Sequence, residues 1–357
     1  MHGGELLFVE QIARSPERVT EEDIALAKVF VVPTLLIFGF DHGDEVRWRP
    51  TDDTCSGKRF KEMQTATANA LLASPYFQRS GGADHLLVAD SYKLWDMERN
   101  SDFSLEFLKA IENMTVGHFE TAEQLAWQRA WRCTITVPYV HKPPLQLRRS
   151  TLSVTATRFR DLAPRDFGVF FMGKVGPDPG YATRRRIATM LGELRDLPMT
   201  YVSTSAPRAL GFEAECDLRA CLEAARCVGC SWNASAPGRL YEHRLQRSEF
   251  SLVIRGDTPS SARLYDALAY GVIPIIVSND LWAIGLPFPG RVPWQDLVFM
   301  LPEAFTAADL RIIAVAPRDM KDRKRKAIRA HLQDVSWTAP GSRVADNVVS
   351  EAARYCM

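Results

Sequence analysis

Two short apolar runs in the second half of the chain place the strongest constraint on its fold. The runs "FSLVI" (250–254) and "IPIIV" (273–277) are short, apolar and rich in branched aliphatic residues. Such runs are typical of parallel strands buried on both faces. A helical pattern that starts near Arg263 separates them, and a connection with about a dozen helical residues fits a right-handed strand–helix–strand crossover. The sequence therefore predicts an α/β fold.

Small polar residues lie where the helix between these strands should begin. Asp257 or Thr258 can cap the helix. Pro259 suits its first turn, because the missing proline N–H has no intrahelical partner there. Gly271 can end the helix in a left-handed conformation. We therefore expect the helix to start near Pro259, at the carboxyl end of a parallel strand.

The residues around this helix start suit an anion, and a diphosphate in particular. Free N–H groups and the helix dipole favour negative charge. Gly256 lets the backbone approach closely, and Ser260 and Ser261 add hydroxyl donors. Arg255 and Arg263 add guanidinium groups suited to bidentate phosphate contact. An ordinary polar turn with two solvated arginines is the alternative, and the local residues alone leave both open.

The composition is that of a soluble globular protein with one large or two medium domains. The chain has 357 residues, 46% hydrophobic and 24% charged, with a formal net charge of +1. This balance gives no electrostatic case for binding nucleic acid or a membrane surface. The basic run "MKDRKRKAIRAH" (320–331) reads as a solvated helix face. The apolar stretch 29–40 is too short to span a membrane and contains Pro33, and the N-terminus does not resemble a signal peptide.

Cysteines cluster in one segment of the chain, "ECDLRACLEAARCVGC". A zinc site is disfavoured there, because the paired spacing of zinc ribbons and a nearby histidine are both missing. We expect one or two disulfides, with buried free cysteines as the alternative. The expected pair is Cys227 with Cys230, or a partner drawn from Cys216 and Cys221.

Two glycosylation sequons accompany these cysteines. They are "NMT" at Asn113 and "NAS" at Asn233. Each triplet is weak evidence alone. Together with the cysteine cluster they favour an oxidising, secretory compartment.

The chain reads as two α/β halves. A segment rich in proline and basic residues (139–166) separates an earlier strand–helix pattern from a later one. We expect an N-terminal domain over residues 1–150 and a C-terminal domain over residues 151–357. Ligands in such folds bind outside the carboxyl ends of strands, often between domains.

Four stretches, in order, resemble the exostosin-like glycosyltransferases of family 47 (GT47). The longest is "SEFSLVIRGDTPSSARLYDALAYGVIPIIVSNDLWAIGLPF" (248–288), which is similar to the signature block of that family. The others are "TEEDIALAKVFVVP" (20–33), "QRSGGADHLLV" (78–88), and "FGVFFMGKV" (167–175) followed by "RRRIA" (184–188). The chain departs from the family at Ala83, where arginine is usual, and at Ile254, where proline is usual.

The resemblance implies a GT-B fold with two Rossmann-like domains facing a cleft. The N-terminal domain would bind the acceptor and be incomplete at its start, because the usual opening strand, anchor and stem are missing. The activity implied is inverting transfer of a sugar from a nucleoside diphosphate sugar, most often a UDP-sugar, to a polysaccharide or glycan. No metal or other cofactor is expected, and the location implied is the Golgi lumen or membrane. Expected partners are the donor and acceptor, with related glycosyltransferases in a homo- or hetero-oligomer.

The polar helix start would then hold the diphosphate leaving group. The residues expected to bind it are Arg255, Gly256, Ser260, Ser261, Arg263 and Arg185. Asp266 lies about one helical turn after Arg263, so it could bind the ribose hydroxyls or form a salt bridge with Arg263. The neighbours of Arg185 in "RRR" make its selection among the three an open choice.

Inversion also needs a base to take the acceptor hydroxyl proton. Asp84 and His85 follow a glycine turn in the first half, and His85 is the safer family match. A hydrogen bond from His85 to the sugar or the backbone is its alternative role. For the whole chain, the alternative is a non-catalytic exostosin-like subunit that binds and supports an active glycosyltransferase. An intact donor turn favours the enzyme, whereas Ala83 and the missing first strand favour the supporting subunit.

Overall fold

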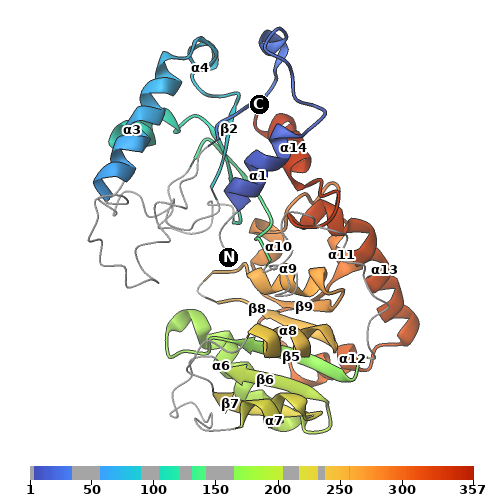
Figure 1. Ribbon diagram of the computed structural model, residues 1–357. Coiled ribbons are helices and arrows are strands. Elements are labelled where there is room, and N and C mark those ends of the chain that lie inside the picture. Colours follow the sequence, from blue (N-terminus) through green and yellow to red (C-terminus); the bar gives the residue numbers. More distant parts are fainter. Residues whose placement is uncertain are drawn as a thin grey trace. The chain divides into compact units, whose positions relative to one another are not determined.

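The computed structural model describes residues 4–33, 57–89, 104–120, 131–141, 165–203, 217–231, 238–256 and 258–357. Within these ranges the chain is an α/β protein with two parallel sheets (Figure 1). The backbone divides into two compact units. Unit 1 comprises Met1–Val140, Ile284–Phe288 and Arg343–Met357, and unit 2 comprises His141–Ala283 and Pro289–Ser342. The first boundary therefore lies at Val140, and the C-terminal segment belongs to unit 1 with the N-terminal half.

Unit 1 contains a four-stranded parallel sheet with the order β1-β2-β3-β4. Its strands are β1 (Phe30–Val31), β2 (His85–Val88), β3 (Thr115–His118) and β4 (Cys133–Thr136). Its helices are α1 (Gly4–Ala13), α3 (Gly57–Ala73), α4 (Pro75–Ser80), α5 (Leu105–Ala110) and α14 (Val344–Tyr355), with a 3₁₀ turn at Ile24–Leu26. β2 and β3 are buried along their whole length, so they form the centre of the unit.

The first and last helices of the chain meet in unit 1. α1 packs against α14, as Figure 1 shows, and the Ser15 hydroxyl donates a 2.8 Å hydrogen bond to Asp346. Cys133 at the start of β4 forms a disulfide with Cys356 just after α14. These contacts explain why the C-terminal segment is part of unit 1 although it lies far from it in the sequence.

Unit 2 is built on a six-stranded parallel sheet with the order β10-β9-β8-β5-β6-β7. Its strands are β5 (Phe167–Gly173), β6 (Met199–Ser203), β7 (Cys227–Ser231), β8 (Ser248–Ile254), β9 (Ile273–Val277) and β10 (Phe299–Leu301). The helices between and after them are α6 (Ala182–Met190), α7 (Leu218–Glu223), α8 (Gly238–Gln246), α9 (Ala262–Ala269), α10 (Leu281–Ile284), α11 (Trp294–Leu297), α12 (Ala307–Ala314) and α13 (Arg318–Val335). Short 3₁₀ turns occur at Pro179–Tyr181 and Leu191–Leu194.

The strand order of unit 2 is that of a Rossmann sheet. Counted from β5 in chain order, the strands run 3-2-1-4-5-6 across the sheet. The chain leaves β5 toward β6 on one side and returns at β8 on the other side, so the topological switch point lies between β5 and β8. In such sheets the crevice outside the carboxyl ends of these two strands is the usual ligand site.

The two apolar runs are parallel strands, as predicted. β8 and β9 are buried and pair in parallel, with Leu252 opposite Ile275. Gly271 follows the connecting helix with φ of 62°, which confirms the left-handed end. The predicted start of the helix near Pro259 is wrong, because α9 begins at Ala262. Ser261 caps it in place of Asp257 or Thr258, since its hydroxyl accepts the Arg263 N–H.

The cysteine cluster forms disulfides. Cys221 in α7 is bonded to Cys227 in β7, with a Cα–Cα distance of 5.0 Å, which confirms one of the expected pairings. The expected pairing of Cys227 with Cys230 is wrong, because the sulfur of Cys227 is bonded to Cys221. Cys230 is also disulfide-bonded, and Cys216 lies outside the described residues.

The basic run lies in α13, as predicted for a helix face. Arg323 is exposed and pairs with Asp319 one turn earlier, whereas Lys321 reaches Glu249 at 2.6 Å. The run therefore combines solvated charges with contacts that attach the helix to β8. Among the described helices, none has the length and apolar character needed to cross a membrane.

Candidate functional site

The candidate site of unit 2 lies at the switch point of its sheet, and we call the region between the two loops there the crevice. Its walls are the loop after β5, which begins at Lys174, and the loop after β8, which begins at Arg255. α9 starts beside this crevice and presents its first turn there. Three arginines lie at this site, and they differ in the partners of their guanidinium groups: Arg184, Arg263 and Arg255.

Arg184 joins the two walls of the crevice. Its guanidinium donates to the carbonyl of Lys174 (2.8 Å) in one wall and to the carbonyls of Ile254 and Arg255 (2.9 Å each) in the other. The side chain is buried and lies over the Tyr181 ring. A side chain at Gly256 would place its Cβ 3.0 Å from Arg184 Nη2, so the glycine allows this close approach. Arg184 therefore holds the crevice in shape.

Arg263 presents its guanidinium at the carboxyl end of β5. Its Nε donates to the Met172 carbonyl at 3.0 Å, and its guanidinium carbon lies 5.4 Å from the centre of the Phe171 ring. A Cβ at Gly173 would lie only 2.2 Å from Arg263 Nη2, so a glycine is required there unless the arginine moves. Nη2 makes no hydrogen bond to any residue that the structure describes. Arg263 is therefore a fixed cation with a donor group left for a ligand.

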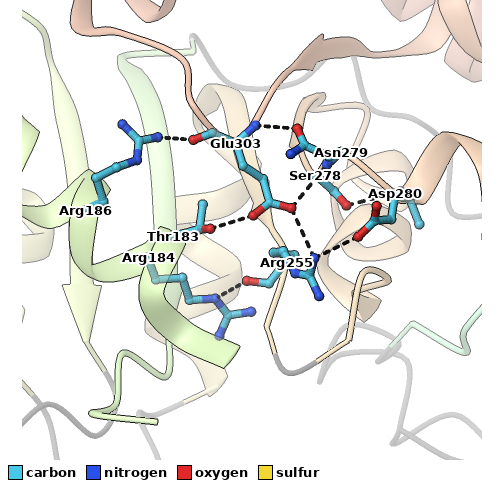
Figure 2. Close-up of polar contacts among 9 residues, drawn as sticks. Thr183, Arg184, Arg186, Arg255, Ser278, Asn279, Asp280 and Glu303 are labelled. Atoms are coloured by element: carbon cyan, nitrogen blue, oxygen red, sulfur yellow. Dashed lines mark hydrogen bonds and ion pairs between the residues drawn. The ribbon is translucent and has the colours of Figure 1, made fainter. Parts of the chain in front are cut away.

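Arg255 is held by two carboxylates (Figure 2). Its Nη1 lies 2.9 Å from Asp280 Oδ2 and 3.2 Å from Glu303 Oε1. Its other guanidinium nitrogens make no hydrogen bond to the described part of the chain, while its backbone N–H donates to the Val277 carbonyl at 3.2 Å. One edge of Arg255 is thus fixed by ion pairs, and the other edge can meet a ligand.

Glu303 connects the carboxyl ends of β8, β9 and β10 with the start of α6. It follows β10, accepts a hydrogen bond from Thr183 Oγ1 at 2.8 Å, and accepts a second from the Asn279 N–H at 3.2 Å. Its own N–H donates to Asn279 Oδ1 at 2.9 Å, as Figure 2 shows. Burial acts to raise the pKa of Glu303, but hydrogen bonds from Thr183, Asn279 and Arg255 and the charge of Arg255 lower it overall. The carboxylate is therefore stabilised in its ionised form.

The other two arginines of the "RRR" run bond to the loops after β5 and β10. Arg185 Nη1 donates to the carbonyls of Gly176 and Asp178 in the loop after β5. Arg186 donates to the Phe305 carbonyl at 3.0 Å and to the Glu303 carbonyl. The sequence singled out Arg185, and it missed the buried bridging role of Arg184. The signal was present, because Arg184 shares the buried face of α6 with Ile187.

The polar residues at the start of α9 have different partners. Ser260 and Ser261 are both mostly buried, and Ser261 Oγ accepts the Arg263 N–H at 3.4 Å. Asp266 accepts a 3.0 Å hydrogen bond from the Tyr241 hydroxyl. Burial and the neighbouring Asp266 raise the pKa of Tyr241 well above its ordinary value, so the phenol stays protonated and donates. The carboxylate of Asp266 is thus oriented by Tyr241.

Asp84 and His85 lie at the amino end of β2. His85 is the first residue of the strand, is buried between the rings of Phe30 and Phe77, and contacts Asp84 through Nδ1 at 2.7 Å. Burial lowers the pKa of His85, although Asp84 acts to raise it. Burial acts to raise the pKa of Asp84, but hydrogen bonds from Ser80, Arg79 and His85 lower it overall.

The carboxyl end of the unit 1 sheet carries residues that the sequence reasoning missed. His118 ends β3, and both His118 and Glu120 are buried. The Glu120 N–H donates to His118 Nδ1 at 3.3 Å, and Phe119 stacks on Tyr139. The signal in the sequence was a histidine and a glutamate two residues apart in "TVGHFE" (115–120).

Of the two sequons, one lies within the described residues. Asn113 is exposed in the turn before β3, where a glycan would have room. Asn233 lies outside the described residues. In the ranges that the structure describes, no group of three or more histidine, cysteine, aspartate or glutamate side chains is placed to hold a metal ion.

Comparison with known proteins agrees with the resemblance seen in the sequence. A family model described as the exostosin GT47 domain matches residues 2–313. The chain belongs to the exostosin GT47 family. It is 27% identical over 278 residues to a probable glucuronosyltransferase of Oryza sativa subsp. japonica, covering 74% of this chain and 54% of the relative. It is 26% identical over 273 residues to a probable beta-1,4-xylosyltransferase of Arabidopsis thaliana, covering 72% and 54%.

The GT47 match includes every residue of the crevice described above. The Arg184, Arg263 and Glu303 contacts all fall within its range, so the candidate site is part of the family domain. The chain spans about half the length of the curated relatives it matches.

Proposed function

We propose that the chain is an inverting glycosyltransferase, which moves a sugar from a UDP-sugar to a polysaccharide or glycan acceptor. The observation that carries this proposal is the position of Arg263 beside Gly173 at the switch point of a Rossmann sheet. When the sugar–phosphate bond breaks, negative charge develops on the leaving diphosphate. A fixed guanidinium next to a helix start is suited to stabilise that charge. GT47 membership and the transferase names of the relatives support the same reaction class.

Arg263 is the main diphosphate ligand in this proposal. Ser260, Ser261 and the α9 N–H groups surround the same place, and Gly256 lets the diphosphate approach the loop after β8. Arg185 acts through the loop after β5, whose carbonyls it holds. We propose that these groups stabilise the leaving group and that no bound metal or other cofactor is needed.

Arg255 and Asp266 lie at the borders of this diphosphate site. Arg255 is a weaker diphosphate ligand than Arg263, because two carboxylates already neutralise it. Asp266, oriented by Tyr241 one turn into α9, is proposed to accept hydrogen bonds from the ribose hydroxyls.

The reaction also needs a base on the acceptor side. As the acceptor oxygen bonds to the anomeric carbon and the diphosphate departs, the acceptor hydroxyl loses its proton. We propose a GT-B arrangement, in which the unit 1 sheet presents its carboxyl end to the acceptor. His85 and Asp84 lie at the opposite end of β2, so we assign them a structural role. His118, at the carboxyl end of β3, is better placed for the acceptor side.

Location and partners follow from the family and the cysteines. The disulfides favour an oxidising compartment, and we propose the Golgi lumen or membrane, as implied by the GT47 resemblance. Homo- or hetero-oligomers with related glycosyltransferases are proposed partners, together with the donor and the acceptor glycan.

Calorimetric measurement of UDP affinity tests the diphosphate assignment. Arg263→Ala removes a charged donor and should weaken UDP binding by about 1.5–3 kcal/mol, or about ten- to a hundredfold. Arg263→Lys should restore only part of the affinity, because a point charge cannot reproduce the planar fork. Gly173→Ala should also weaken binding, since its new Cβ would displace the Arg263 guanidinium.

The exposed Arg323 on α13 supplies the matched control, and Arg323→Ala should bind UDP as the wild type does. If folded Arg263→Ala bound UDP as tightly as the wild type does, the assignment of the diphosphate to this crevice would be wrong. Transfer or slow hydrolysis of a nucleotide sugar separates the enzyme from a non-catalytic subunit, which would bind UDP without turnover.

A further inference from the structure

A buried threonine in unit 1 carries a hydroxyl group for which the described part of the fold gives no partner. Thr115, the first residue of β3, is fully buried, and its Oγ1 makes no hydrogen bond to any residue that the structure describes. Burying a hydroxyl without a partner costs stability. The branched shape of threonine suits a strand, but valine has the same branching without the hydroxyl. The strand therefore explains the shape of this side chain and not its hydroxyl.

Thr200 in β6 shows what a buried strand threonine does when the fold uses it. It is as buried as Thr115, and its Oγ1 accepts a 2.6 Å hydrogen bond from Arg244 Nε. Arg244 is itself buried, so the hydroxyl of Thr200 satisfies a buried charged donor. Removing that hydroxyl leaves the donor unpaired, whereas removing the hydroxyl of Thr115 takes no hydrogen bond from any described group.

Two residues before Thr115, the side chain of Asn113 is exposed in a turn. The turn covers residues 111–114 and is closed by a 3.1 Å hydrogen bond between the backbones of its two end residues. The amide nitrogen Nδ2 of Asn113 lies beside Gly81, where an added Cβ would be 3.9 Å away. Gly81 has no side chain that could cover this amide. A bulky group can therefore be attached to Nδ2 without displacing the core.

We propose that Asn113 is N-glycosylated and that the Thr115 hydroxyl serves this modification and not the fold. The acceptor triplet requires serine or threonine two residues after the asparagine, and Thr115 supplies it. Nδ2 of Asn113 bonds to the anomeric carbon of an oligosaccharide carried on a lipid diphosphate. The lipid diphosphate leaves, and the amide gives up one proton. An oligosaccharyltransferase of the secretory pathway acts on the extended chain, before β3 forms and buries Thr115.

The glycan projects from the amino end of the unit 1 sheet. β2 and β3 are parallel, so the turn before β3 and the glycine turn before β2 lie at the same edge. His118 ends β3 at the opposite edge. A glycan on Asn113 therefore leaves the carboxyl end of the sheet uncovered. The two described disulfides favour the compartment in which this modification occurs.

Secretion of the full chain from a eukaryotic host tests the site. N-glycosidase converts a glycosylated asparagine to aspartate, so treatment in heavy-oxygen water followed by peptide mass spectrometry labels each such position, and Asn113 should be labelled. Asn113→Gln and Thr115→Val should each remove this glycan from the intact mass. Thr115→Ser keeps the triplet and should keep the glycan. Asn233→Gln removes the other triplet, and as the matched control it should leave the glycan on Asn113 in place.

Thermal unfolding tests the role of the Thr115 hydroxyl in the fold. Asn113→Gln and the double variant that adds Thr115→Val both lack the glycan, so their difference reports the hydroxyl alone. The double variant should melt about 2–4 °C higher, because valine removes a buried hydroxyl without a partner. Thr200→Val should melt lower than the wild type, since it leaves Arg244 Nε unpaired.

Three results would overturn the proposal. An unlabelled Asn113 in secreted, folded wild-type protein would remove the site, and that measurement needs no variant to fold. A glycan retained on Asn113 in Thr115→Val would show that the hydroxyl does not serve the modification. A double variant that melts below Asn113→Gln would show that the hydroxyl supports the fold. These measurements do not involve UDP, so this inference and the proposed function can fail separately.

Discussion

Arg184 gives the sharpest test of how the crevice is built, because one side chain holds both of its walls. Its guanidinium donates to one carbonyl after β5 and to two at the end of β8 and just beyond it, all at 2.8–2.9 Å. The side chain is only 5% exposed. We predict that Arg184→Ala destabilises unit 2 and weakens UDP binding, although Arg184 itself has its donors directed at the backbone.

The size of the effect follows from these three bonds. Hydrogen bonds from a charged donor contribute about 1.5–3 kcal/mol each, so simple addition gives about 4.5–9 kcal/mol. That sum overstates the loss, because water can enter the vacated space and because bonds within one network are not additive. Single substitutions seldom cost more than about 4–5 kcal/mol. We therefore expect Arg184→Ala to lower the free energy of unfolding by about 3–4 kcal/mol.

Guanidinium chloride unfolding followed by circular dichroism measures this loss, and calorimetry measures UDP affinity at a temperature where the variant is folded. Arg195→Ala is the control, because Arg195 is exposed and makes no hydrogen bond to the described residues. It should change stability by less than about 0.5 kcal/mol. A loss below about 1 kcal/mol in Arg184→Ala, with UDP affinity unchanged, would refute the reasoning that this arginine joins the walls.

Three further predictions concern stability and unit 1. Replacing both cysteines of a disulfide by serine should lower the free energy of unfolding, and more so for the longer loop. Loop entropy predicts a loss of about 5 kcal/mol for Cys133–Cys356, whose sequence separation is 223. It predicts a loss of about 2 kcal/mol for Cys221–Cys227, whose separation is 6. Equal losses in denaturant titrations would contradict that order. Burial lowers the pKa of His141 from 6.5 to about 4, so the unfolded chain takes up its proton first. The free energy of unfolding should therefore fall by about 3 kcal/mol as the pH is lowered from 6.5 to about 4, and His141→Gln should make this fall smaller. His85→Ala should lower the melting temperature but leave kcat unchanged in folded protein, and a large fall in kcat would restore His85 as the base.

Local sequence patterns predicted the strands β8 and β9 well and the cap of the helix between them less well. The β8 and β9 runs and the left-handed Gly271 depend on residues next to each other, so the sequence contains what is needed. The cap of α9 could be any of several small polar residues. In the structure Ser261 is the cap, and Arg263 in the first turn of α9 donates to the Met172 carbonyl of β5. That second contact joins residues far apart in the chain, so local sequence patterns could not predict it.

The candidate site, too, could be predicted from the sequence only in part. The local residues gave Arg255 and Arg263, and the family resemblance gave an arginine of "RRR", but the three consecutive arginines could not be distinguished by residue type. The helical period distinguishes them, since Arg184 shares the buried face of α6 with Ile187 and Met190. The partners of Arg255 could not be predicted, because Asp280 and Glu303 follow different strands and meet only when β9 and β10 pair.

The arginines of the crevice are thus divided by how their charges are used. Arg184 directs its donors at backbone carbonyls, and Arg255 is neutralised by two carboxylates. Arg263 has one backbone bond and a weak contact to Ser261, so it is the least neutralised of the three. A leaving diphosphate needs charge that is fixed before the bond breaks and not already paired, because a partner that must be displaced costs part of the stabilisation. We therefore propose Arg263 as the main ligand of the diphosphate and Arg255, already neutralised by two carboxylates, as the weaker one.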